Sequence, residues 1–188
     1  NTFLITLSNH LGTHIDTPGH FFNSGRTISE YSIEELVFQK PLIVDCPKGI
    51  NEVIEIDDIA SAMNSNDSDI LLIRTGFYKY RKDDIHTYCY KNPYLSLHAA
   101  EYLRKTFSTL KAIGIDCISI ASYEKREIGR EVHKTLLNSD EFKGSPIPII
   151  EDLYLPHEIK ELDELIISPI FIEGVDSAPC TVIGIIQD

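Results

Sequence analysis

The sequence predicts an α/β fold in which helices flank a mixed β-sheet, and we expect residues 1–188 to form a single domain. A chain of 188 residues suits one domain with a sizeable hydrophobic core. Short runs rich in isoleucine, leucine and valine alternate with helix-like stretches. These stretches do not follow the strict strand–helix–strand rhythm of a purely parallel sheet, so a mixed sheet is expected.

Seven segments are expected to form strands, because they are short, apolar or β-branched, and bounded by turn residues. The clearest is segment 69–75, which ends at Gly76 and should be a central strand. Segment 146–150 should lie at a sheet edge, because proline cannot donate to a strand ladder. The other five segments are 2–7, 41–46, 114–120, 169–173 and 181–186.

Helices are predicted where capping residues precede apolar side chains at helical spacing. The four predicted helices cover residues 32–37, 57–63, 96–109 and 131–137. Segment 64–68 should be a polar loop. Segment 77–94 is rich in tyrosine, lysine and aspartate without clean periodicity, so we expect a long loop over a site or an interface.

The charge and cysteine content narrow the possible environments and partners. There are 29 acidic and 17 basic residues, and the formal net charge of −12 opposes binding to nucleic acid or to an anionic membrane. The four cysteines lack C-x-x-C spacing and should be reduced. No apolar run approaches a membrane span and no signal peptide opens the chain, which predicts a cytoplasmic protein. Asn1 is not a native start, so we expect that a short N-terminal segment is missing.

The stretch from His10 to Phe21 concentrates the residues that bind metals. Its glycine, threonine and proline residues disfavour a helix, and in an extended chain successive side chains point to opposite faces. His10, His14 and Asp16 then share one face. Imidazole and carboxylate together suit zinc, manganese or iron, so this face predicts a metal site. The alternative is a purely structural histidine cluster.

His20 lies beyond the turn made by Pro18 and Gly19, and it can approach the same point from another direction. A histidine can take a proton from an attacking water and return it to a leaving amine near neutral pH. We therefore regard His20 as a candidate general acid/base, with a further metal ligand as the alternative.

The same stretch contains the motif H-x-G-T-H-x-D-x-P-x-H without a mismatch. In this motif the chain resembles the cyclase-like metal-dependent hydrolases, which include bacterial kynurenine formamidase and isatin hydrolase. The resemblance implies a swivelling β/β/α fold with a barrel-like sheet, a homodimer or homotetramer, and an acid/base role for His20. It also implies two further metal ligands, His133 in an H-x-x-L-L segment and Glu151 in an E-x-L segment. Asp152, next to Glu151, should face solvent.

Weaker matches suggest residues around a substrate. Arg74 fits the family's R-T-G, and Ser119 fits its G-I-D-x-x-S, so both are candidates for shaping the pocket. Phe21 and Phe22 could supply aromatic contacts in a chain that has no tryptophan. The chain also lacks the P-V-R segment that the family often has, because Pro179 is followed here by cysteine and threonine.

These expectations combine into a metal-dependent hydrolase of a carbon–nitrogen bond in a small amide. The leading substrate is an aryl formamide such as N-formylkynurenine, as the resemblance implies, with one or two zinc ions, or manganese, as cofactor. A cyclic amide of the isatin type is the runner-up. A catalytically inactive metal-binding or sensor protein and a cupin-like oxygenase are alternatives from other classes. The helical segments argue against a cupin.

Overall fold

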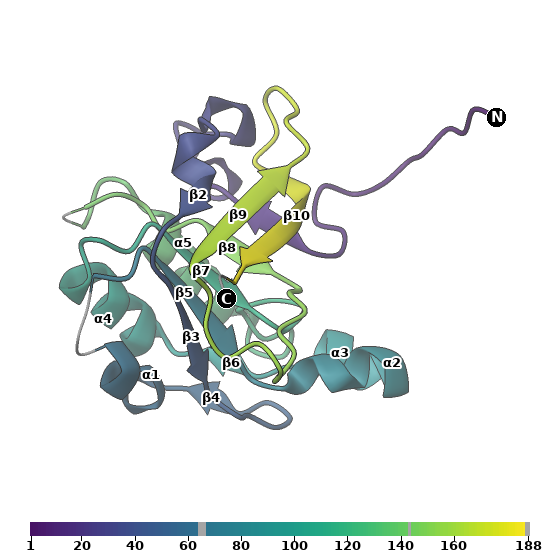
Figure 1. The fold of residues 1–188 in the computed structure, drawn as a ribbon. Coiled ribbons are helices and arrows are strands. Elements are labelled where there is room, and N and C mark those ends of the chain that lie inside the picture. Colours follow the sequence, from purple (N-terminus) through teal and green to yellow (C-terminus); the bar gives the residue numbers. More distant parts are fainter. Residues whose placement is uncertain (64–66, 143, 187–188) are drawn as a thin grey trace.

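The computed structural model describes residues 1–63, 67–142 and 144–186, and its main feature is an eight-stranded mixed sheet (Figure 1). In spatial order the strands are β2 (Val37–Phe38), β9 (Glu164–Pro169), β10 (Ser177–Ile185), β1 (His14–Asp16), β8 (Ile149–Glu151), β7 (Ala112–Ile115), β5 (Ile70–Arg74) and β3 (Pro41–Asp45). Two short parallel strands, β4 (Val53–Ile54) and β6 (Tyr94–Leu95), form a separate pair.

The sheet is parallel in one half and antiparallel in the other. Strands β3, β5, β7 and β8 run parallel, whereas β1, β10, β9 and β2 join them through antiparallel pairs. Strands β2 and β3 form the two opposite edges of the sheet, although only Gln39 and Lys40 separate them in the sequence. Both of their backbone N–H groups donate to the carboxylate of Asp69 at 2.9 Å. The short connection brings the two edges together, so the sheet curls into the barrel-like form that we expected.

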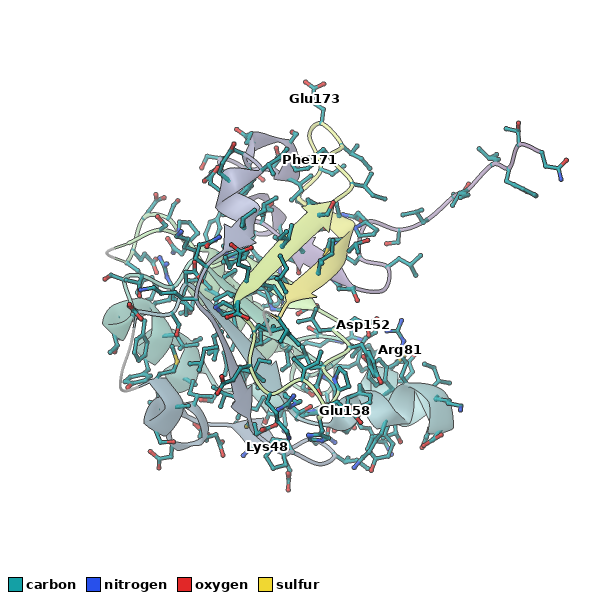
Figure 2. The ribbon with its side chains drawn as sticks, viewed as in Figure 1. Lys48, Arg81, Asp152, Glu158, Phe171 and Glu173 are labelled. Carbon is teal, nitrogen blue, oxygen red and sulfur yellow. The ribbon has the colours of Figure 1, made fainter. Side chains whose placement is uncertain are left out.

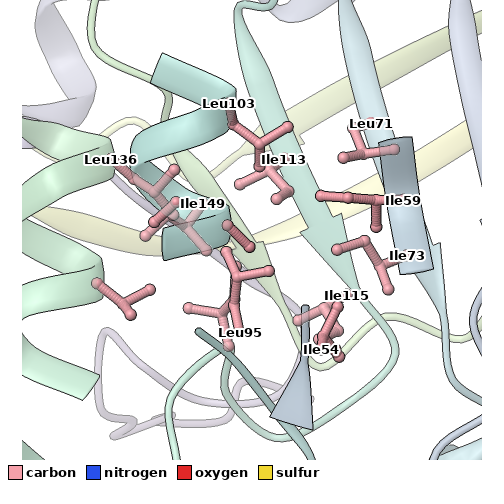
Figure 3. Close-up of a cluster of buried hydrophobic side chains, with 14 of the residues drawn as sticks. Ile54, Ile59, Leu71, Ile73, Leu95, Leu103, Ile113, Ile115, Leu136 and Ile149 are labelled. Carbon is pink, nitrogen blue, oxygen red and sulfur yellow. The ribbon is translucent and has the colours of Figure 1, made fainter. Parts of the chain in front are cut away.

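Alternation along the strands divides the core into two clusters. Leu71 and Ile73 of β5 point toward the helices, whereas Ile70 and Leu72 point into the curl of the sheet. Figure 3 shows the helix-facing cluster, in which Ile59, Leu103 and Leu136 pack against the strands. This cluster covers one face of the parallel half with helices and fixes the position of the last of them, which carries His133.

Helices flank the sheet as predicted, but the helix expected at 32–37 is only a 3-10 turn at Glu34–Leu36, and a strand begins at Val37. The α-helices are α1 (Ile56–Met63), α2 (Tyr80–Asp83), α3 (Ile85–Tyr90), α4 (Leu97–Thr106) and α5 (Arg126–Leu137). Four 3-10 turns complete the described part: η1 (Pro18–His20), η2 (Ile28–Glu30), η3 (Glu34–Leu36) and η4 (Phe77–Lys79). Ser96 caps α4 by accepting from the Ala99 N–H, as its place in the sequence indicated. None of the described helices is both long and apolar enough to cross a lipid bilayer.

Several predicted elements were wrong. Residues 2–7 form no strand; they extend away from the body, with Phe3 and Leu4 exposed, because they pair with no described strand (Figure 1). Segment 77–94 is not a long loop but holds η4, α2, α3 and β6, and Asp84 caps α3 through the Thr87 N–H. The helix predicted at 131–137 begins earlier, at Arg126. Of the polar loop predicted at 64–68, residues 64–66 lie outside the described part of the chain.

The strand predictions also needed correction at the C-terminal end. Strand β8 is central, between β1 and β7, because its prolines precede the paired residues and remove no donor from the ladder. The strand expected at 169–173 is wrong, because β9 ends at Pro169. The residues that follow form an exposed turn, and Phe171 and Glu173 lie at its tip (Figure 2). Segment 114–120 is a strand only up to Ile115, in β7.

Candidate active site

The site is built where β1 and β8 pair at the centre of the sheet. Their antiparallel register sets His14 opposite Glu151, and Asp16 opposite Ile149. Ile15 packs into the curl of the sheet, so His14 and Asp16 face the other way, toward the helices. His14, Asp16 and Glu151 are all buried, which is costly for carboxylates unless they are paired or bind a metal.

Three histidines surround the two carboxylates. The Nε2 atom of His14 lies 3.5 Å from Asp16 Oδ1 and 3.6 Å from Glu151 Oε2. His133 reaches in from α5, with its Nε2 atom 3.3 Å from Glu151 Oε1 and 3.8 Å from Asp16 Oδ2. His10, from the loop before β1, lies 3.1 Å from Asp16 Oδ1 through Nδ1. The structure thus brings together all five residues that we had considered as metal ligands.

Backbone carbonyls orient two of the imidazoles. The Nδ1 atom of His14 donates to the Gly12 carbonyl at 2.8 Å, and that of His133 donates to the Gly129 carbonyl at 2.9 Å. Each Nε2 atom then faces the carboxylates and, once it has lost its proton, is the atom that can bind a metal. Gly12 has φ +66°, a backbone conformation that L-residues with a side chain rarely adopt.

The donor set fits a divalent metal. Ligand atoms of His14, Asp16 and Glu151 lie within 4.8 Å of one another, and so do those of His10, Asp16 and His20. Asp16 belongs to both groups, as a bridging carboxylate would. Its Oδ1 atom is buried and, although His10 Nδ1 lies 3.1 Å away, it has no hydrogen bond of good geometry, so a cation would satisfy it. Mixed imidazole and carboxylate donors suit zinc or manganese.

Glu151 is held in place by neighbours on the loop after β7. Its Oε1 atom accepts hydrogen bonds from Ser119 Oγ and the Ile120 N–H, both at 2.8 Å. Burial alone would raise the pKa of Glu151, but the hydrogen bond and charge of His133 outweigh it and lower the pKa to about 2. The carboxylate therefore stays ionised, ready to bind a cation. Ser119, which we expected near substrate, contacts Glu151.

His20 is paired with a carboxylate that sequence reasoning missed. Its Nδ1 atom lies 2.9 Å from Oδ2 of Asp176, the residue just before β10. Burial alone would raise the pKa of Asp176, but the hydrogen bond with His20 outweighs it and lowers this pKa below its usual range. No feature of the surrounding V-D-S sequence signals this role, because only the pairing of β10 with β1 brings Asp176 to the site.

A cavity of about 530 Å³ opens onto the cluster. It is lined by all five candidate ligands and by residues that include His20, Phe21, Asn92, Ser119, Tyr123, Arg126 and Arg130. The ring of Phe21 lies 4.7 Å from the ring of His20, measured between centroids. Two predicted substrate residues lie elsewhere. Phe22 packs on the helix-facing core, and the buried guanidinium of Arg74 binds Asp45 and the carbonyls of Pro156 and Ile159.

Asp152 does not face solvent as expected. It is 2% exposed, has φ +57°, and contacts side chains of α2 and α3. Its carboxylate accepts from the Tyr88 hydroxyl and from Arg81 Nη1, the latter at 2.7 Å, and Arg81 and Asp152 lie side by side in Figure 2. Asp152 therefore ties the α2–α3 segment to the strand that carries Glu151.

Comparisons with known proteins find relatives over nearly the whole chain. A kynurenine formamidase from Geobacillus thermodenitrificans is 29% identical over 184 residues, which cover 95% of this chain and 77% of that protein. A solved structure described as a potential metal-dependent hydrolase with cyclase activity is 27% identical, with a TM-score of 0.72, covering 95% of this chain and 80% of that one. Isatin hydrolase A from Labrenzia aggregata shares the fold at a TM-score of 0.79 and 18% identity, covering 97% and 75%.

A family model also matches the chain directly. The model named Cyclase, with the description "Putative cyclase", matches residues 2–122. This region contains β1 and the whole histidine-rich motif, whereas His133 and Glu151 lie beyond it. Because the match covers more than half of the 188 residues, the chain belongs to the Cyclase family.

Proposed function

We propose that this protein is a metal-dependent hydrolase that cleaves the carbon–nitrogen bond of a small amide, with aryl formamides such as N-formylkynurenine as the leading substrates. The observation that carries the proposal is that five candidate ligand side chains and His20, which is paired with Asp176, line one cavity. The kynurenine formamidase relative supports the substrate class. Zinc is the leading cofactor, as one or two ions, and manganese is the alternative.

The residues that would hold the metal are His10, His14, Asp16, His133 and Glu151. When bound, a divalent ion supplies Lewis-acid polarisation of the amide carbonyl and favours ionisation of a water molecule. Ser119 and the Ile120 N–H keep Glu151 in one orientation throughout.

His20 is proposed to move the proton. Its Nδ1–H donates to Asp176, which leaves Nε2 to accept a proton from the attacking water. The water oxygen bonds to the carbonyl carbon, the carbon–nitrogen bond breaks, and Nε2 returns the proton to the leaving nitrogen. The products are a carboxylic acid and an amine. The carboxylate of Asp176 stabilises the imidazolium form of His20 between the two transfers.

The test is a substrate panel assayed on protein stripped of metal and reloaded with zinc or manganese. We expect metal-dependent release of the aromatic amine from aryl formamides, including N-formylkynurenine. Cleavage of cyclic amides such as isatin alone would shift the substrate class to the runner-up. Stoichiometric metal binding without hydrolysis of any amide would contradict the proposal and favour a metal-binding or sensor protein.

A further inference from the structure

One face of α5 lines the cavity from its deep end outward. Arg126, Gly129, Arg130 and His133 all line the cavity, and their spacing of three, four and seven residues is that of a single helix face. From the level of His133, Arg130 lies about 4.5 Å and Arg126 about 10.5 Å along the helix axis, given a rise of 1.5 Å per residue. His133 is buried whereas both arginines are exposed, so the arginines lie on the solvent side of the candidate metal cluster.

In the part of the chain that the structure describes, neither guanidinium has a hydrogen-bond or ion-pair partner. The chain has six arginines, and four of them have hydrogen-bond or ion-pair partners: Arg26 with Glu35, Arg74 with Asp45, Arg81 with Asp152, and Arg104 with backbone carbonyls. Within the described residues, Arg126 and Arg130 have none. Arg126 makes only a cation–π contact, with its Cζ atom 4.0 Å from the centre of the Tyr123 ring.

This lack of partners is unexpected in an acidic protein. The net charge is −12, and ion pairs could form with many surface carboxylates. Arginine has a planar fork of donors that matches a carboxylate in a bidentate way, which a point charge such as lysine cannot do. Two guanidinium groups without ion-pair partners on the wall of a cavity can thus bind an anionic group, and the Phe21 and Tyr123 rings add apolar surface to the same cavity.

We propose that Arg126 and Arg130 bind a carboxylate of the substrate, so that the preferred amides are anionic and carry this group on the side away from the cleaved bond. The inference rests on the proposed function, because it places the amide at the metal cluster and the carboxylate at the outer part of α5. It favours carboxylate-bearing aryl formamides over neutral cyclic amides of the isatin type.

The test uses 4-formamidobenzoate and its methyl ester, which differ only in the negative charge. We expect the wild-type protein to prefer the acid, measured as the ratio of the two kcat/KM values. Arg126→Gln and Arg130→Gln should each lower this ratio about tenfold, as expected for loss of one charged hydrogen-bonding partner. Lys134→Gln removes a cation from the same helix that pairs with Glu131 outside the cavity, and it should leave the ratio unchanged.

A binding measurement separates the arginines from the metal, because a carboxylate could also bind an ion directly. Calorimetry with 4-aminobenzoate on chelator-treated protein should show weaker binding in both arginine variants and wild-type binding in Lys134→Gln. Equal affinity in wild type and arginine variants, or an unchanged kcat/KM ratio, would overturn the inference. If neither formamide is hydrolysed, the proposed function fails, and the binding data still decide whether the arginines hold a carboxylate.

Discussion

Removal of the metal should expose a pH-dependent ion pair at the heart of the sheet. Without a metal ion, His133 and Glu151 face each other at 3.3 Å and both are buried. Burial alone would lower the pKa of His133, but the hydrogen bond and charge of Glu151 outweigh it and raise the pKa from 6.5 to about 9. The lowered pKa of Glu151 reflects the same interaction.

The His133–Glu151 pair stabilises the metal-free protein most at acid pH. Because the folded state holds the His133 proton more tightly than the unfolded chain, the pair stabilises the fold fully below pH 6.5, and this contribution is lost as pH rises through about 9. A pKa shift of this size means that the pair contributes on the order of 3 kcal/mol to the free energy of unfolding. We therefore predict that the metal-free protein is more stable at the acid end of this interval than at the alkaline end.

The measurement is urea unfolding of chelator-treated protein across the interval from pH 6.5 to about 9. His133→Gln removes the titrating group and should flatten the dependence. His98→Gln, on the exposed start of α4, should keep the wild-type profile. If metal-free wild type is equally stable at both ends, or if His133→Gln retains the full dependence, the pair does not hold the proton as argued.

Three further outcomes are expected. His14→Ala should lose metal and activity together, whereas His20→Ala should keep most of its metal, measured by elemental analysis, and lose roughly 10²–10⁴-fold in rate; equal metal loss in both variants would make His20 a ligand. Gly129→Ala would bring a Cβ within 2.5 Å of the Ala121 Cβ atom, so it should destabilise the protein by about 1–3 kcal/mol in urea unfolding and weaken metal binding; wild-type stability with full metal would refute this packing argument. The homodimer or homotetramer implied by the family should appear in sedimentation at micromolar concentration, and a pure monomer would count against it.

The local sequence predicted those features of the fold and the site that depend only on neighbouring residues. The period of two along β1 was enough to group His14 with Asp16, because strand geometry alone decides which side chains share a face. Likewise, Ser96 was recognisable as the residue that caps the start of α4. These features need no knowledge of distant parts of the chain.

Features that depend on strand order were beyond local reasoning. The central place of β8 follows from its pairing with β1, far away in the sequence, and a proline-rich segment read alone suggested an edge. Asp176 reaches His20 only because β10 lies beside β1. Arg130 looks like any exposed helical residue until α5 is seen to border the cavity. Helices α2 and α3 were missed because they are too short to show periodicity.

The pairing of β1 with β8 also makes the candidate metal centre a link between the two ends of the chain. Thr13 and Asp152, neighbours of the ligands, are joined by a 2.6 Å hydrogen bond across 139 residues of sequence. An ion held by His14 and Glu151 would close the same long loop, and closing a loop of this length restricts the unfolded chain strongly. Loss of metal should therefore loosen the contact between the N-terminal motif and the C-terminal half, and proteolysis should separate these halves more readily than it does in the metal-loaded protein.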